Sequence, residues 1–354
     1  MEKGVSLGIY LLINSLFVVK YLSRIAVSPV ISVIVYVLLV ACLLWLIRRW
    51  YNPSVEKGFS HDGTLSDVIN PSVEKGHSPY LNNTTAVKSS ATQEPSRLKW
   101  VYISLATFTV AAIITLHQLV DPYQLQVDRW SAIDHFLQRL LTGEYPYLAQ
   151  THLGGYGSPF PVWNIFHLPF FIAGNIAIGM TVIVLILVSS LKKLTGSYLH
   201  ATIYLVLLVM SPAFWYEVAV RSDLIYNFIL CFLLCGWWYK RGISAESSPW
   251  FTGIISGLIL STRLSVIIPF FIFLFSGVVK SGWKQRFQFV GSGAGVFILS
   301  FLPFIVWDAD SLIFFEYNPF VLQTRQGSPY ELIVLFSMLI PLSLMWKQIG
   351  RAHV

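Results

Sequence analysis

The sequence is poor in charged residues. Only 12% of its 354 residues are Asp, Glu, Lys or Arg, whereas about a quarter of a typical soluble domain is charged. Apolar residues make up 55% of the chain, and the mean hydropathy is +0.65. A soluble fold cannot bury so much apolar surface. This composition therefore excludes a water-soluble globular protein and is typical of an integral membrane protein built from helices.

Cysteines and cofactor motifs are also scarce. The three cysteines, Cys42, Cys231 and Cys235, all lie in apolar runs, where a thiol behaves as a small hydrophobe. The glycine-rich stretch 291–295 lies inside an apolar segment with no strand before it, so it predicts a helix-packing face rather than a nucleotide loop. We therefore expect no disulfide framework, no metal site and no cofactor.

The net charge of +7 could suggest a nucleic-acid partner. However, the basic residues cluster at the ends of apolar segments, and no surface of interleaved basic and aromatic residues is visible. Basic residues in this position set the orientation of a membrane protein. We expect the lipid bilayer, and not nucleic acid, as the partner of this charge.

Long apolar segments are what the sequence has in abundance. About ten of them are long enough to count as candidate crossings, although several are short for a bilayer. The predicted fold class is therefore all-α, a polytopic transmembrane protein in which some helices are short or re-entrant. The segments are 5–19, 25–47, 101–120, 175–191, 198–218, 222–239, 250–262, 264–279, 287–307 and 329–346.

One polar stretch, residues 48–99, interrupts the apolar segments. It is rich in Ser, Asn, Thr and Pro, and it contains the heptapeptide Asn-Pro-Ser-Val-Glu-Lys-Gly at 52–58 and again at 70–76. Such a composition cannot bury enough apolar surface to fold. The stretch is predicted to be a disordered cytoplasmic linker with a duplicated unit.

The linker divides the chain into an N-terminal transmembrane hairpin, 1–47, and a main membrane region, 100–348. The final segment, 349–354, is expected to be a non-native tail, so the main region is expected to be truncated at its C-terminus. We treat the hairpin and the linker as an extension added to the main region.

Orientation follows from the basic residues. Placing 48–99 in the cytoplasm also places most Lys and Arg residues there, as the positive-inside rule requires. The loop 121–160 then faces the outside. We expect a multi-pass protein of the inner (cytoplasmic) membrane with its active site facing out. The same rule predicts a hairpin between 250 and 279 whose apex lies near Arg263.

The outer loop 121–160 is the most informative stretch. Within it, apolar residues from Ile133 to Leu141 recur at helical spacing, and Gly143 follows them. This pattern predicts an amphipathic helix on the membrane surface. The next apolar piece, 161–173, is too short to cross a bilayer and is predicted to lie flat or to be re-entrant.

The order of motifs in this loop carries a resemblance to a known family. An acidic residue follows an outward-going helix, then come the surface helix, the motif Gly143-x-x-Pro146-Tyr147 and a Gly/Pro/Tyr turn at 154–161. This order resembles the membrane-embedded GT-C glycosyltransferases that use polyprenyl-phosphate sugars, in particular their bacterial mannosyltransferase-like branch. The similarity continues in the small-residue segment 250–263.

The resemblance covers about residues 120–346 and implies both a fold and an activity. It implies a GT-C-like arrangement of helices. It also implies a hexosyltransferase that moves a hexose, such as mannose, from a polyprenyl-phosphate carrier. The acceptor would be a glycan, a glycolipid or a protein on the outer, periplasmic side of the membrane.

Such a transfer needs a general base for the acceptor hydroxyl, and a carboxylate in the outer loop could serve. Asp128 matches the family's catalytic acid position by its distance to Gly143-x-x-Pro146-Tyr147. The spacing is slightly longer than expected, so Asp121, nearer the end of the preceding helix, remains a second candidate. The alternative for both is a solvated loop carboxylate or a helix cap.

The leaving phosphate needs cationic ligands, for which a guanidinium is suited because it binds phosphate through two donors. The candidates are Arg263, Arg221 and Arg325. An unpaired arginine facing lipid would cost about 2.5–3.5 kcal/mol. Arg263 therefore either meets the donor phosphate or forms a permanent ion pair with an acid such as Glu217 or Asp223.

The remaining candidate ligands of the substrate surround these residues. Glu217, Arg221 and Asp223 lie near the apex of the 198–239 hairpin, where they could bind substrate or neutralise one another. Other polar residues of the outer loops could line the same cavity. These are Tyr147, Tyr156 and Gln323, together with Arg325.

Three other functions stay open at this point. A lipid-linked glycan polymerase or ligase would share the topology and the chemistry. A multi-pass transporter or flippase should show inverted repeats and ionisable residues at the bilayer midplane, whereas here these residues cluster at the outer rim. A non-catalytic membrane scaffold is opposed only by the loop motifs.

Overall fold

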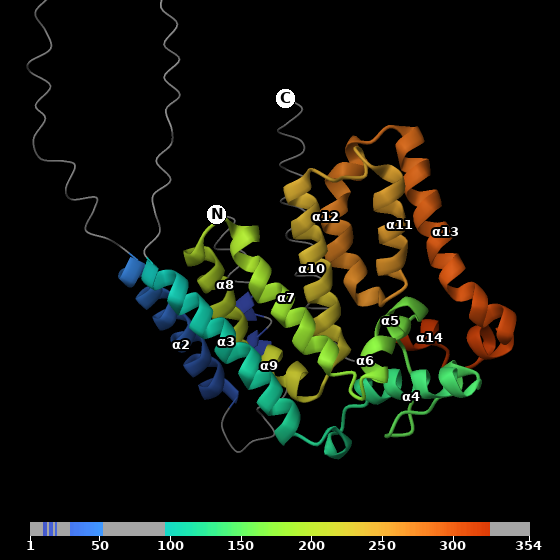
Figure 1. Cartoon of the computed structure of the whole chain (residues 1–354), viewed down its shortest axis with the longest axis horizontal. Helices are drawn as coiled ribbons and strands as arrows, with labels where there is room; N and C mark the ends of the chain where they lie inside the picture. Colours follow the sequence, from blue (N-terminus) through green and yellow to red (C-terminus); the bar gives the residue numbers. More distant parts are fainter. Residues whose placement is uncertain (1–9, 13, 17, 20–28, 52–95, 326–354) are drawn as a thin grey trace, which may run out of the picture.

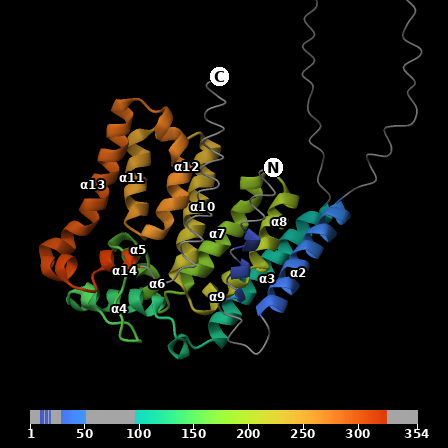
Figure 2. The same cartoon turned by 180° about the vertical axis from the view of Figure 1, so that it is seen from behind.

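The structure is a computed structural model (Figures 1 and 2). The linker repeats, the last apolar segment 329–346 and the tail 349–354 lie outside the residues that it describes. Within the described part, the fold is helical, and the only strand-like feature is a single antiparallel bridge between Gln150 and Tyr156. The residues described are 10–12, 14–16, 18–19, 29–51 and 96–325.

Three described helices are long and apolar enough to cross a membrane: α3 (Ser96–Leu119), α7 (Ile178–Thr195) and α13 (Trp283–Trp307). The pair α8 (Tyr198–Val209) and α9 (Pro212–Ala219) forms a fourth if its bend of 63° is a break in one span. The described chain is therefore all-α, with helices suited to a membrane. By length and hydropathy, three of the described helices are full spans, or four if the bent pair is counted. This number is smaller than the number of candidate crossings that the sequence predicts over the described residues.

Four other helices complete the bundle: α2 (Pro29–Tyr51), α10 (Asp223–Arg241), α11 (Pro249–Leu260) and α12 (Ile267–Lys280). Local signals set their ends. The hydroxyl of Ser222 accepts the Leu224 N–H and begins α10, as a capping serine does. The helix stops at Gly242, whose φ of +62° suits a residue without Cβ. In addition, α3 begins at Ser96, inside the range predicted for the linker.

The two ends of the bundle differ in composition. The elements α4 (Arg129–Thr142), α5 (Pro161–Phe166), α6 (Leu168–Ile172) and α14 (Pro319–Thr324) gather at one end, which we call the α4 end (Figure 1). The basic C-terminal turns of α7, α10 and α12 lie at the opposite end (Figure 1). The basic residues in the last turns of these three helices therefore lie at the end away from α4.

Helices α11 and α13 pack closely through small residues. A Cβ atom added to Gly257 would lie 2.4 Å from the carbonyl oxygen of Gly293, and one added to Gly253 would meet α13 at 2.0 Å. The packing face predicted for 291–295 is therefore present at Gly293. It does not extend to Gly291 or Gly295, where an added Cβ would meet no heavy atom within 4 Å. These two glycines lie off the α11 contact.

The predicted surface helix is α4. It runs across the end of the bundle rather than along it (Figures 1 and 2). It ends at Gly143, in the left-handed region with φ +76°, as the sequence predicts. Ile133, Phe136 and Leu137 are buried, but Leu141 is 57% exposed.

Candidate functional site

Asp128 lies at the N-cap position of α4 but does not cap the helix. Its side chain accepts no hydrogen bond from the N–H groups of the first turn. Instead, Oδ2 accepts a hydrogen bond from the Thr151 hydroxyl at 2.7 Å. The side chain is half-buried beside Gly155, where an added Cβ would lie 3.0 Å from Oδ2. The carboxylate is therefore turned toward the loop that follows η3 (Pro146–Leu148) and away from its own helix.

Asp121 has a different environment. It is the N-cap of the short helix η2 (Pro122–Gln124), and its Oδ1 accepts the Tyr123 N–H at 3.0 Å. Its Oδ2 accepts a hydrogen bond from the Gln124 side chain at 3.2 Å. Asp121 is also exposed. Of the two candidates for the general base, Asp121 is thus the one whose carboxylate serves as a helix cap.

The loop beside Asp128 is a tight turn built on Thr151. The Thr151 N–H donates to the Gly155 carbonyl at 2.8 Å, and the Gly155 N–H donates to the Thr151 hydroxyl oxygen at 3.0 Å. Gly154 has a φ of +81°, which a residue with a side chain rarely adopts. Because the same Thr151 hydroxyl binds Asp128, the turn fixes the position of that carboxylate.

Arg263 forms a buried ion pair with Asp223. The Arg263 Nε donates to Asp223 Oδ2 at 2.5 Å, and Nη2 donates to Oδ1 at 2.9 Å. The indole N–H of Trp163 donates to the same Oδ2 at 2.7 Å. The two charged side chains are only 11% and 2% exposed. Of the two interpretations of Arg263 that the sequence allows, the structure contains the ion pair, and the acid is Asp223.

The Arg263 guanidinium also reaches the loop that carries Gly155. Its Nη1 donates to the Ser158 hydroxyl at 3.1 Å. The side chain of Gln323, in α14, donates to the Ser158 carbonyl at 2.7 Å and accepts the Leu264 N–H at 2.6 Å. Ser158 therefore joins the Asp128 loop, the turn after α11 and α14. Gln323 acts in this arrangement as a link between backbone segments.

A second ion pair links the N-terminus of α4 to α9, and a hydrogen bond from the same arginine reaches the N-cap of α10. Arg129, the residue after Asp128, lies 3.2 Å from Glu217 and donates to the Ser222 hydroxyl at 2.9 Å. Arg129 follows Asp128 and Ser222 precedes Asp223, so this hydrogen bond holds together the segments that carry Asp128 and Asp223. Asp128 and the Asp223–Arg263 pair thus belong to one region at the α4 end.

Arg221 is held elsewhere. It has a left-handed backbone with φ 51°, and its guanidinium donates to the carbonyl of His117 at 2.6 Å, in the last turn of α3. Burial lowers the pKa of Arg221 from its ordinary value. Among the described residues, Glu217, Arg221 and Asp223 form no ion pairs with one another. The interpretation as a mutually neutralising cluster is therefore wrong, because packing gives each residue another partner.

The other predicted ligands occupy three environments. Tyr147 is 3% exposed, and burial raises the pKa of its phenol well above the usual range, so the group stays protonated. Tyr156 is half-buried and stacks on Tyr317 at a centroid distance of 5.5 Å. Arg325 is exposed at the C-cap of α14. Of these three residues, Tyr156 and Arg325 present surface at the α4 end.

Three residues around the Arg263–Asp223 pair were not singled out from the sequence. Ser158 and Trp163 contact the Arg263–Asp223 pair. Asn227, one turn into α10, donates to the Thr262 hydroxyl at 2.9 Å and supports the backbone beside Arg263. Two of them lie in the 155–163 segment and one lies in α10. No spacing along the chain identifies such partners, because only the packing of the segments brings them together.

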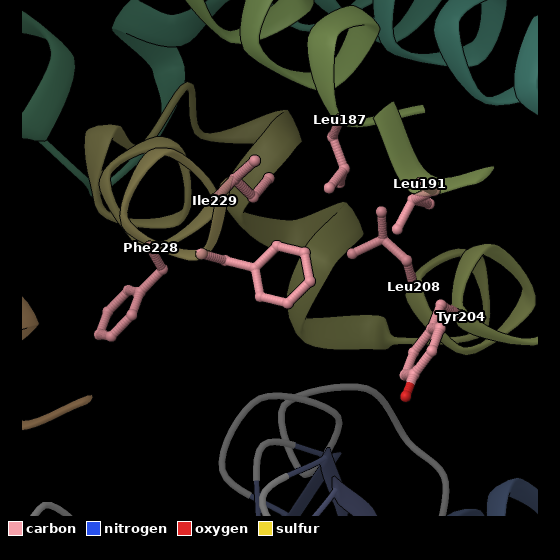
Figure 3. Close-up of a pocket in the computed structure, with 7 residues that line it drawn as sticks. Leu187, Leu191, Tyr204, Leu208, Phe228 and Ile229 are labelled. Carbon is pink, nitrogen blue, oxygen red and sulfur yellow. The ribbon is translucent and has the colours of Figure 1, made fainter. Parts of the chain in front are cut away.

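An open apolar pocket lies away from this region. It has a volume of about 220 Å³ and is lined by side chains of α7, α8 and α10 (Figure 3). No carboxylate, amine or guanidinium lines it, so it offers no group for acid–base chemistry. It is an apolar gap between helices. Its lining consists of Leu187, Leu191, Tyr204, Leu208, Phe228, Ile229 and Phe232.

No family model, no curated protein and no solved structure matches this chain. The α4 end combines three features. A partly exposed carboxylate lies on a fixed turn, a buried ion pair anchors Ser158 just after that turn, and an exposed guanidinium lies at the C-cap of α14. This set can accept a proton and bind an anionic group.

Proposed function

We propose that this protein is a membrane glycosyltransferase of the GT-C kind that transfers a hexose from a polyprenyl-phosphate carrier to an acceptor hydroxyl. The observation that supports it most is the state of Asp128. Its carboxylate is half-buried, does not cap its helix, and receives one hydrogen bond from the described residues, that of Thr151. A carboxylate with unused lone pairs on a fixed loop suits a general base.

In this reaction Asp128 takes the proton of the acceptor hydroxyl as the acceptor oxygen attacks C1 of the hexose. The bond between C1 and the phosphate oxygen breaks, and the electron pair leaves with the polyprenyl phosphate. One C–O bond forms as another breaks, so the configuration at C1 inverts. General-base assistance of this kind contributes about 100- to 10,000-fold to a rate.

The leaving phosphate needs a cation that is accessible. Arg263 is engaged with Asp223 and Ser158, so we assign it the positioning of the 155–158 turn. Arg325 is exposed at the end of α14, and Gln323 in the same helix binds Ser158. We therefore assign the phosphate contact to Arg325, whose guanidinium can donate two parallel hydrogen bonds.

The activity can be tested with the full chain reconstituted in liposomes that contain a polyprenyl-phosphate hexose labelled in the sugar. We expect label to move to an acceptor alkyl glycoside, with polyprenyl phosphate as the second product. If the protein is instead a flippase, the labelled lipid changes leaflet and remains intact. Intact lipid in the presence of every hexose donor tested would rule out the proposed transfer.

The proposal also places the α4 end outside the cell. Leu153 is 44% exposed at that end, and Glu246 is exposed at the basic end. Single cysteines at these positions, in a chain without its three native cysteines, should react oppositely with an impermeant thiol reagent added to intact cells. Labelling of the Glu246→Cys variant alone would reverse the proposed orientation.

A further inference from the structure

Three aromatic side chains form a cluster beside the Asp128 loop. The rings of Tyr156 and Tyr317 stack with centroids 5.5 Å apart and an interplanar angle of 19°. Phe315 meets Tyr156 edge-on at 5.0 Å and 82°. All three side chains are half-buried, so part of each remains accessible. We call this cluster the aromatic platform (Tyr156, Phe315 and Tyr317).

The aromatic platform is fixed in position from two sides. The Gln150 side chain donates to the Tyr156 hydroxyl at 3.1 Å, and the backbones of these two residues form the antiparallel bridge. On the other side, Asn318 is buried and its side chain accepts the Val321 N–H at 3.0 Å, at the start of α14. The rings therefore need little reordering to bind a ligand, which favours affinity.

The aromatic platform also lies next to the proposed general base. Tyr156 directly follows Gly155, the residue against which the Asp128 carboxylate rests. The Gln150 amide is exposed and bonds the Tyr156 hydroxyl, and the exposed Glu316 lies between Phe315 and Tyr317 in the chain. The aromatic platform thus combines an apolar face with polar groups beside it in the chain, close to the proposed base.

A pyranose has the complementary surface. Its axial C–H groups form an apolar face with partial positive charge, which is attracted to the negative face of an aromatic ring. Its hydroxyl groups project from the edge, where amide and carboxylate groups can bind them. We propose that the aromatic platform binds the sugar ring of the acceptor and presents one of its hydroxyls to Asp128. This inference rests on the proposed function and specifies that the acceptor is a glycan or a glycolipid.

Binding can be measured without the transfer reaction. We would record saturation-transfer NMR spectra of the full chain in detergent with methyl α-D-mannopyranoside and methyl β-D-glucopyranoside as probes. Replacing Tyr317 by Leu keeps an apolar side chain and removes the aromatic face, so the saturation of the sugar C–H protons should fall about fivefold. The control is Phe314→Leu, because Phe314 is 78% exposed in the same segment and outside the aromatic platform. Its spectrum should match that of the wild type.

Kinetics separate this inference from the proposed function. In the liposome assay, Tyr317→Leu should raise the KM for the glycoside acceptor about fivefold with kcat little changed. Tyr317→Phe keeps the aromatic face, so its KM should equal that of the wild type. Active wild-type enzyme with an unchanged acceptor KM in Tyr317→Leu would overturn the platform and leave the transferase intact. Sugar saturation that depends on Tyr317, without any transfer, would support the platform and overturn the transferase. No saturation of either probe by the wild type would overturn the platform.

Discussion

Asp128 and Asp223 occupy similar places in the chain but opposite environments. Each lies at the start of a helix, Asp128 before α4 and Asp223 in the first turn of α10. Asp223 is 1% exposed and accepts three hydrogen bonds, from Arg263 and Trp163. Asp128 is half-buried and accepts one, from Thr151. The same side chain is thus saturated with donors in one region and available in the other.

This difference assigns the two acids different tasks. A carboxylate that is buried with a guanidinium and an indole N–H must break those contacts before it accepts a proton. A carboxylate with a single donor can accept one with little rearrangement. Asp223 therefore suits the anchoring of the loop, and Asp128 suits proton transfer. Substitutions at the two acids should therefore have different consequences.

Removing the buried acid should have the largest effect. Asp223→Ala leaves the Arg263 guanidinium without its carboxylate in a site that is only 11% exposed. Loss of one partner of a buried pair costs about 3–5 kcal/mol. We expect a marked fall in the melting temperature of the protein in detergent. Replacing Arg263 by Met in the same chain should recover part of the loss. An unchanged melting temperature in Asp223→Ala would contradict the anchoring role.

Removing the available acid should affect activity and not stability. Asp128→Asn keeps the shape of the side chain and can still accept the Thr151 hydrogen bond. Because an amide is not a base, hexose transfer should fall about 100-fold or more. The melting temperature should stay close to that of the wild type. Glu144→Gln is a matched control, since Glu144 is exposed and paired only with Arg139 in the described structure.

A steric change tests how much the close α11–α13 contact contributes to stability, for comparison with the Asp223–Arg263 ion pair. Gly257→Ala places a Cβ 2.4 Å from the Gly293 carbonyl oxygen, so the two helices must move apart. Overpacking of this kind costs about 1–3 kcal/mol. Gly291→Ala is the control, because no heavy atom lies within 4 Å of the added Cβ. Equal melting temperatures of the two variants would show that the close contact contributes nothing.

The smallest effect is expected at the third acid. Asp121 caps the exposed helix η2 through the Tyr123 N–H, so Asp121→Ala should cost about 1 kcal/mol or less in stability. Transfer should remain near the wild-type rate. An inactive Asp121→Ala variant beside an active Asp128→Asn variant would instead make Asp121 the base.

Local signals allowed several elements to be predicted from the sequence. The apolar spacing from Ile133 to Leu141, followed by Gly143, predicts α4 and its end, because helical period and left-handed caps depend on neighbouring residues. The glycine-rich stretch 291–295 likewise predicts a close-packing face, and Gly293 lies on it. The apex predicted near Arg263 falls between α11 and α12 for the same reason, since the run of apolar residues is interrupted there.

The composition and the apolar spacing thus predict a helical, apolar chain and the amphipathic helix that ends at Gly143. Which acid is saturated with donors depends instead on how distant segments pack. Asp223, Arg263 and the 155–163 segment that carries Ser158 and Trp163 lie far apart in the sequence. Their hydrogen bonds exist because α10, the turn after α11 and the 155–163 segment meet at one end of the bundle. Contacts of this kind depend on how helices pack, and no pattern of neighbouring residues along the chain specifies them.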